Sequence, residues 1–109
     1  MNHSKYHNKR TTINGITFDS RKEAQRYSEL CLMQRAGKIK DLRRQVRYEI
    51  VPKVGKERAT YYVADFVYAE KQGDIWHTVV EDAKGVKTDV YRLKRKLMLW
   101  RHGIEIREV

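Results

Sequence analysis

The segment that decides the fold spans residues 62–85 and reads YVADFVYAEKQGDIWHTVVEDAKG. Apolar and polar residues alternate on both sides of a central Gly73-Asp74 pair, and this period of two residues is typical of β-strands. Glycine at the first position of a two-residue loop is the preference of a type II′ turn. The segment therefore predicts an antiparallel hairpin, with strands at about 60–71 and 76–84.

The predicted turn determines which acidic side chains face each other. In a hairpin with this turn, Asp65 lies directly opposite Asp82. Opposite residues of an antiparallel pair point to the same side of the sheet, with Cβ atoms roughly 4.5–5.5 Å apart. Lys84 is two residues beyond Asp82 and shares its side, whereas Glu81 points to the other side. A bulge or a longer turn would shift the register by one residue and exchange Glu81 for Asp82.

Two carboxylates placed in this way repel each other, so the pair indicates that a cation neutralises them. Mg²⁺ prefers carboxylate oxygens, keeps several waters and shares the phosphate oxygens of a substrate, which fits an open site of two acids. Lys84 would then orient or activate the attacking water, or stabilise charge on the phosphate. The alternative is an ion pair of Asp65 with Lys84 and a solvent-exposed Asp82. We favour the metal site because both aspartates interrupt a strand face that otherwise carries valine.

The segments outside this hairpin complete an α/β pattern. Asn14-Gly15 predicts a small hairpin, and Ser20 is a good N-cap for a helix over about 21–36, which Gly37 ends. A strand follows at about 45–51. After Gly85, a second helix is indicated by apolar residues at three- and four-residue spacing, namely Val90, Leu93, Leu97 and Trp100. Alternation in residues 104–109 predicts a short last strand at a sheet edge.

A third acid, Glu23, lies in the first turn of the helix predicted at 21–36. Helical periodicity places it with Tyr27 and Leu30 on the inward face. It also follows Ser20 by three residues, which is the pattern of a capping box. The spacing favours neither reading, so Glu23 is either a third acid of the site or a helix cap.

Length and charge limit the kind of protein. The 109 residues allow one domain, and a net charge of +10 favours a polyanionic partner such as nucleic acid, with an anionic membrane surface as the competing reading.

We find no apolar run long enough to span a bilayer and no signal peptide, so we expect a cytoplasmic protein without membrane contact. The single cysteine, Cys31, excludes an internal disulfide. Residues 1–12 predict a flexible basic arm in which Lys9 and Arg10 could hold phosphates.

The second predicted helix is strongly basic and begins only a few residues after Lys84. Such a helix could follow the phosphates beside the reactive one. The residues that we expect to bind DNA there are Lys87, Arg92, Lys94 and Arg95. Since the sequence shows no recognition-helix motif and no zinc finger, we expect it to recognise the structure of DNA, such as branches, flaps or ends.

The pattern of Glu23, then Asp65, then Asp82-Ala83-Lys84, followed by a basic helix, resembles the PD-(D/E)XK nuclease superfamily. More closely, the segments DSRKEAQRYSEL, YYVADFVY and VVEDAKGVKTDVYRLKRKL look like a family of short phage and prophage proteins that is grouped with these nucleases. The resemblance covers nearly the whole chain after residue 15. One departure is that Ala64, and not proline, precedes Asp65.

The resemblance implies a restriction-endonuclease-like αβββαβ core, with a mixed sheet flanked by helices, over residues 13–109. It also implies hydrolysis of DNA phosphodiester bonds with Mg²⁺ or Mn²⁺, in phage replication or recombination in the host cytoplasm. Asp65 and Asp82 would bind the metal, Glu23 would support them, and Lys84 would be catalytic. A branched substrate requires two active centres, so we expect a homodimer. The alternative is an inactive nucleic-acid-binding protein of the same fold.

Overall fold

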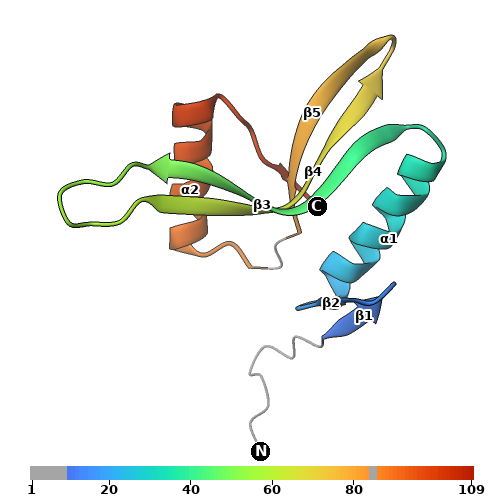
Figure 1. Cartoon of the computed structure of the whole chain (residues 1–109), viewed down its shortest axis with the longest axis horizontal. Helices are drawn as coiled ribbons and strands as arrows, with labels where there is room; N and C mark the ends of the chain where they lie inside the picture. Colours follow the sequence, from blue (N-terminus) through green and yellow to red (C-terminus); the bar gives the residue numbers. More distant parts are fainter. Residues whose placement is uncertain (1–9, 84–85) are drawn as a thin grey trace, which may run out of the picture.

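The computed structural model describes residues 10–83 and 86–109, and Figure 1 shows the order of their elements. These are β1 (Thr11–Ile13), β2 (Ile16–Phe18), α1 (Arg21–Arg35), β3 (Ile39–Val51), β4 (Thr60–Gln72), β5 (Ile75–Asp82), α2 (Asp89–His102) and β6 (Arg107–Glu108). From α1 onward this is the predicted order of helix, three strands, helix and strand, so the fold is mixed α/β, as predicted. Within the described ranges, no helix is long and apolar enough to cross a membrane.

Four strands form the main sheet in the order β3-β4-β5-β6. Strands β3, β4 and β5 are antiparallel, and β6 lies parallel to β5 at the sheet edge, where the sequence predicts it. The β3 strand starts at Ile39, earlier than the predicted residue 45. A bulge between Lys40 and Arg43, where Asp41 has a φ of +57°, lets this early part of the strand also pair with β4.

The β4–β5 hairpin has the predicted turn. Gly73 has a φ of +63°, as the first position of a type II′ turn requires. The pairs run in unbroken register from Gln72 opposite Ile75 to Phe66 opposite Glu81. An exchange of Glu81 for Asp82 would need a one-residue shift of the register, and these pairs contain no such shift.

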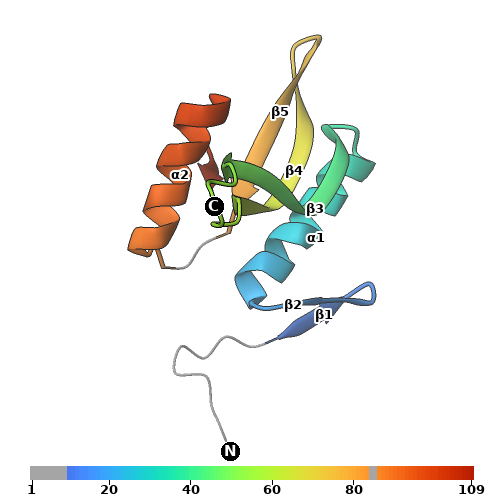
Figure 2. The same ribbon diagram turned by 60° about the vertical axis from the view of Figure 1, so that its left-hand side comes forward.

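Each helix packs against its own hydrophobic cluster. Ala24 and Leu30 of α1 belong to a cluster with Phe66 and Tyr68 of β4. A second cluster contains the buried α2 residues together with residues from the strands, namely Ile50, Tyr62, Ala64, Val67, Val80, Tyr91, Met98 and Ile106. In Figures 1 and 2, the two helices lie apart from each other, with the strands between them. The ends of β4 and β5 thus lie between two separately packed layers.

The inward face of α2 differs from the predicted one. Val90, Leu93 and Trp100 are exposed, whereas Tyr91 and Met98 are buried. Both sets have helical spacing, so the sequence contains two apolar stripes on one helix. The structure packs Tyr91 and Met98 into the second cluster and leaves Val90, Leu93 and Trp100 on the surface. Leu97, the remaining residue of the predicted stripe, is partly buried against the same cluster.

The N-terminal segment forms a hairpin as predicted, with positive φ angles at Asn14 (+52°) and Gly15 (+78°). Strand β1 begins at Thr11, so the last two residues of the predicted arm over 1–12 belong to this hairpin. The rest of that arm, Arg10 excepted, lies outside the described residues. Lys9 is among those residues.

Candidate functional site

The site predicted from the sequence lies at the end of β5, one residue beyond the last pair that β4 and β5 form. The last pair between the two strands is Phe66 opposite Glu81, and one further step of the same register would bring Asp65 opposite Asp82. The backbone N–H of Ala83 donates a hydrogen bond of 2.8 Å to Oδ2 of Asp65. The Asp65 carboxylate therefore reaches across to the end of β5, next to Asp82.

Asp82 is fully buried, and its carboxylate is bound by a tyrosine. The hydroxyl group of Tyr62 donates to Oδ2 of Asp82 at 2.6 Å. Burial raises the pKa of Tyr62, and the hydrogen bond to Asp82 raises it further, so the phenol stays protonated and remains a donor. The alternative in which Asp82 is exposed to solvent is therefore wrong.

Glu81 points away from this pair and has a different environment. Arg26 of α1 binds both of its carboxylate oxygens, Nε to Oε1 at 2.8 Å and Nη2 to Oε2 at 2.7 Å. The Tyr68 hydroxyl donates to Oε2 as well. Burial and this hydrogen bond raise the pKa of Tyr68 to about 12. Glu81 is thus part of a buried ion pair that joins α1 to β5, which is a structural role.

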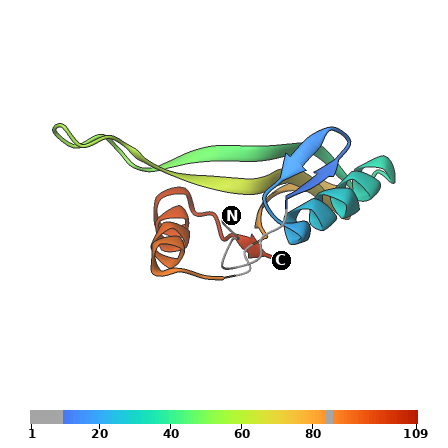
Figure 3. The same ribbon diagram turned by 90° about the horizontal axis from the view of Figure 1, so that it is seen from below.

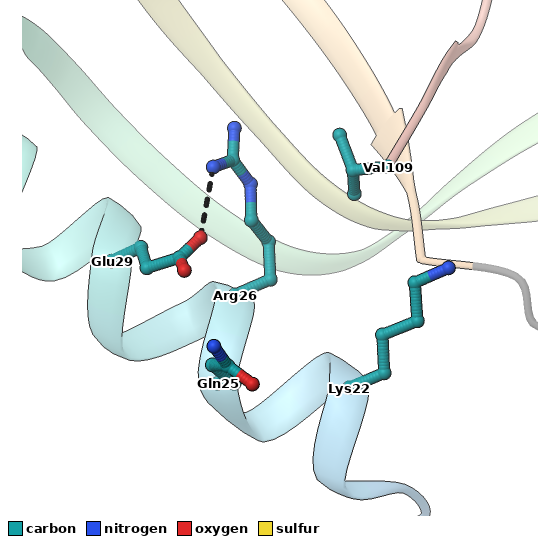
Figure 4. A pocket seen from close by; sticks show the side chains of 5 residues that line it. All are labelled: Lys22, Gln25, Arg26, Glu29 and Val109. Atoms are coloured by element: carbon teal, nitrogen blue, oxygen red, sulfur yellow. Dashed lines mark hydrogen bonds and ion pairs between the residues drawn. The ribbon is translucent and has the colours of Figure 1, made fainter.

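Figure 4 shows the α1 side of this junction. A cavity of about 220 Å³ lies between α1 and the end of the chain, and Lys22, Gln25, Arg26, Glu29 and Val109 line it. The backbone N–H of Val109 donates to the carbonyl oxygen of Asp82 at 3.0 Å. The C-terminal residue therefore helps to hold the backbone of the candidate site in place.

The structure places Glu23 in the capped first turn of α1, with its side chain against residues of β3. Its backbone N–H is capped by the Ser20 hydroxyl at 3.2 Å, while its largely buried carboxylate accepts a hydrogen bond from Gln45 Nε2 at 3.3 Å. A guanidinium nitrogen of Arg44 lies 3.6 Å from the same oxygen. Burial raises the pKa of Glu23, the charge of Asp65 raises it further, and Arg44 lowers it. Glu23 is therefore electrostatically coupled to the β4 aspartate.

Two residues of this environment were not predicted. Tyr62 precedes Asp65 by three positions, and no spacing rule connects them. Gln45 lies between β3 residues that pair with either neighbour of Asp65, and it has a left-handed φ of +53°. Non-glycine residues rarely adopt this conformation, and those that do are often found at functional sites. Neither feature leaves a signal in the sequence.

The structure does not assemble the three acids into one cluster. Within residues 10–83 and 86–109, no three His, Cys, Asp or Glu side chains are close enough to hold one metal ion. The assignment of Asp65 and Asp82 as metal ligands therefore stays a prediction. Lys84, the predicted catalytic lysine, lies outside the described residues.

The predicted DNA-binding residues in and just before α2 differ in their surroundings. Lys87 and Arg95 both bind Glu108, at 3.3 and 2.9 Å, and Arg92 pairs with Asp89 at 3.3 Å. Lys94 lines a cavity of about 240 Å³ that Tyr62 and Thr88 also border. Lys94 therefore shares a cavity with Tyr62, the residue that binds Asp82. Arg10, from the predicted arm, is exposed.

No curated protein and no solved structure shows significant similarity to this chain. A family profile does match: its description is "Protein of unknown function (DUF1064)", and the match covers residues 3–107. Because this match spans nearly the whole length, the chain belongs to the DUF1064 family.

Proposed function

We propose that this chain is a DNA endonuclease of the PD-(D/E)XK type that depends on Mg²⁺ or Mn²⁺. The observation that carries the proposal is the hydrogen bond that the Ala83 N–H donates to Asp65, because it holds the Asp65 carboxylate at the end of β5, where Asp82 is the preceding residue. In the sequence, Lys84 follows two residues later and completes the Asp-x-Lys motif. The order of helices and strands supports the same superfamily.

The donor set fits a hard divalent cation. Carboxylate oxygens are the ligands that Mg²⁺ prefers, and like charges opposite each other destabilise a sheet unless a cation neutralises them. Asp65 and Asp82 would hold the ion, with Glu23 close enough to Asp65 to support the negative potential. Two protein ligands suffice because Mg²⁺ usually keeps several waters and binds substrate phosphate groups. When bound, the ion would supply an activated water and neutralise charge on the phosphate.

The protein residues around the pair have separate tasks in this proposal. The Tyr62 hydroxyl holds Oδ2 of Asp82 in a fixed position. The Ala83 amide orients the Asp65 carboxylate in the same way. Lys84 would place its ammonium group beside the attacking water or the developing phosphate charge.

The substrate that we propose is DNA of particular structure, such as branches, flaps or ends, cut during phage replication or recombination. The support is a net charge of +10 together with the basic α2 beside the acid pair. A homodimer would supply the two centres that a symmetric branch requires.

A second candidate is a protein of the same fold that binds nucleic acid without cleaving it. Two observations favour it: the Asp82 carboxylate is fully buried, and no described group of three acids could hold a metal. A buried aspartate held by a tyrosine can be a purely structural element. The two candidates differ in metal binding and in cleavage, and agree on DNA affinity.

The test is incubation of the purified chain with supercoiled, linear and branched DNA in Mg²⁺ or Mn²⁺. The variants are Asp65→Asn, Asp82→Asn and Lys84→Ala, and the control is Asp74→Asn in the exposed β4–β5 turn, which makes the same chemical change far from the acid pair. We expect metal-dependent cleavage by the wild type and the control, and its loss in the other three. Calorimetric titration with Mn²⁺ should show binding that Asp65→Asn and Asp82→Asn abolish.

Three results would reject the enzyme. The first is the absence of metal-dependent cleavage on every substrate, and the second is cleavage that is unchanged in Asp82→Asn and Lys84→Ala. The third is metal binding that survives both aspartate substitutions. DNA binding without cleavage or metal binding would establish the second candidate instead.

A further inference from the structure

The hairpin of β3 and β4 continues beyond the body of the protein. α2 holds β3 at Glu49, through Arg101 Nη2 to Oε1 at 2.9 Å and through His102, whose Nε2 lies 2.6 Å from the backbone oxygen. Beyond this point, every residue from 52 to 58 is exposed. Figure 3 shows the hairpin passing α2 and projecting away from it. We call residues 52–58 the arm tip. It is the end of the β3–β4 hairpin and is separate from the N-terminal arm predicted over residues 1–12.

The arm tip is an ordered turn. Val54 and Glu57 form an isolated antiparallel bridge, with Val54 N–H donating to Glu57 at 3.1 Å and Glu57 N–H donating back at 2.9 Å. Gly55, between them, has a φ of +57°, which glycine adopts without steric cost. The hairpin of β3 and β4 therefore ends in a closed turn, which lies beyond its last strand pair, Val51 with Thr60.

The arm tip carries positive charge that the protein does not neutralise. Lys53, Lys56 and Arg58 are exposed, and none of them forms an ion pair within the described part of the chain. The one acid of the tip, Glu57, is exposed too. By contrast, three arginines of α2 each bind an acid, namely Arg92, Arg95 and Arg101. The concentration of unpaired cations at the end of a projecting ribbon favours a polyanion as the partner.

A two-stranded β-ribbon has the width that the major groove of B-DNA admits, about 12 Å. We propose that the arm tip binds double-stranded DNA, with its ribbon in the major groove and its cations on the flanking phosphates. This inference rests on the proposed function, because the duplex would be the one whose strand is cut at Asp65.

The distance to the candidate site agrees with one duplex serving both. Arg58 precedes Asp65 by seven residues and Lys56 precedes it by nine. At about 3.3 Å per extended residue, these cations lie up to roughly 23 and 30 Å from Asp65 along β4. One turn of B-DNA spans about 34 Å. The arm tip would therefore hold the duplex within one turn of the phosphate that reacts.

The test compares two triple variants that remove the same charge. One is Lys53→Ala/Lys56→Ala/Arg58→Ala at the arm tip, and the control is Arg35→Ala/Lys38→Ala/Lys71→Ala, whose residues are exposed near the turns at the opposite end of the hairpin. Affinity for a fluorescent duplex of about two helical turns is measured by anisotropy, without divalent metal, from about 50 to 200 mM salt. Circular dichroism checks that both variants fold.

We expect the arm-tip variant to lose at least about tenfold in affinity and to reduce the salt slope by up to about 3, since each lost phosphate contact removes roughly 0.9. The control should keep the wild-type slope. An equal loss in both variants would mean that only net charge matters, and no loss in the arm-tip variant would assign the tip to a partner other than DNA. Either result overturns the inference.

The outcome is separable from that of the nuclease proposal. A wild type that binds duplex DNA through the arm tip but cleaves nothing would keep this inference and reject the enzyme. A wild type that cleaves DNA, with an arm-tip variant that binds and cleaves equally well, would keep the enzyme and reject the role of the arm tip.

Discussion

The Tyr62 hydroxyl and the Asp82 carboxylate form a buried hydrogen bond of 2.6 Å that connects the second cluster to the end of β5. A hydrogen bond to a charged group contributes about 1.5–3 kcal/mol, and the cost of its loss is greater when the remaining partner is buried. Tyr62→Phe keeps the ring and removes the donor. We therefore expect it to lower the free energy of unfolding by about 2 kcal/mol in urea denaturation.

Tyr61→Phe is the matched control, because the neighbouring ring stacks on the Arg47 guanidinium at 4.1 Å and its hydroxyl forms no hydrogen bond with residues 10–83 or 86–109. It should change the free energy of unfolding by less than about 0.5 kcal/mol. A double-mutant cycle of Tyr62→Phe with Asp82→Asn isolates the pairwise energy. Equal effects of the two Tyr→Phe changes would contradict the assigned role of this bond.

The ion pair of Arg26 with Glu81 predicts a larger effect. Removal of one partner of a buried pair leaves an uncompensated charge and costs about 3–5 kcal/mol. Arg26→Met should therefore destabilise the protein by about this amount. The double variant Arg26→Met/Glu81→Gln should recover most of the lost stability, because the buried charge disappears and the Tyr68 hydroxyl still has an acceptor at residue 81. Thermal and urea unfolding measure both variants.

The control for this pair is Glu29→Gln, which removes the other, surface partner of Arg26. A surface ion pair contributes about 0–1 kcal/mol, so this variant should stay close to the wild type. If Arg26→Met/Glu81→Gln is no more stable than Arg26→Met, the charge of Glu81 is not the source of the loss.

The orientation of α2 gives a third prediction. Met98 is fully buried, whereas Trp100 is 78% exposed. Met98→Ala should lower the free energy of unfolding by about 2–5 kcal/mol because it leaves a cavity in the second cluster. Trp100→Ala should change it by no more than about 0.5 kcal/mol. The reverse order in urea denaturation would mean that α2 packs through the other stripe.

The two apolar stripes of α2 show where the sequence stops being informative. Periodicity predicts that the segment is a helix, but both stripes satisfy it. The choice depends on contacts with distant residues: Met98 packs in the second cluster, and the Tyr91 hydroxyl donates to Glu108 at 2.7 Å. Local pattern cannot specify such a contact, so the helix was predictable and its inward face was not.

The same limit applies to the candidate site. The register of β4 and β5 was predictable, because the Gly73-Asp74 turn sets it locally. The Arg26–Glu81 pair joins residues 55 positions apart, and no local rule reports it. The left-handed Gln45 follows from the irregular course of β3, which propensity does not predict. The turn and the N-cap were therefore enough to predict the positions of the acids. The residues that contact these acids could be identified only in the structure.

Gln45 itself provides a fourth prediction. A left-handed conformation costs a non-glycine residue about 1–2 kcal/mol. Gln45→Gly and Gln45→Ala both lose the hydrogen bond to Glu23, but only the alanine keeps the steric cost. The glycine variant should therefore be about 1 kcal/mol more stable than the alanine variant in urea denaturation. The same two substitutions at the exposed β3 residue Arg47 should give the opposite order, because glycine weakens an ordinary strand position.

The raised pKa of Glu23 predicts how stability depends on pH. Burial is its main cause and the charge of Asp65 adds to it, so the folded protein binds the proton more tightly than the unfolded chain does. The stability linked to this proton is present below the ordinary pKa of 4.5 and is lost as pH rises through the folded pKa. Glu23→Gln, which cannot ionise, avoids that loss. Its stability relative to the wild type should thus be greatest at neutral pH and should decline toward pH 4.

Urea denaturation across this range measures the difference, with Glu57→Gln at the exposed arm tip as a control that should show no such trend. A relative stability of Glu23→Gln that is constant with pH, or that rises toward acid pH, would contradict the coupling of Glu23 to burial and to Asp65.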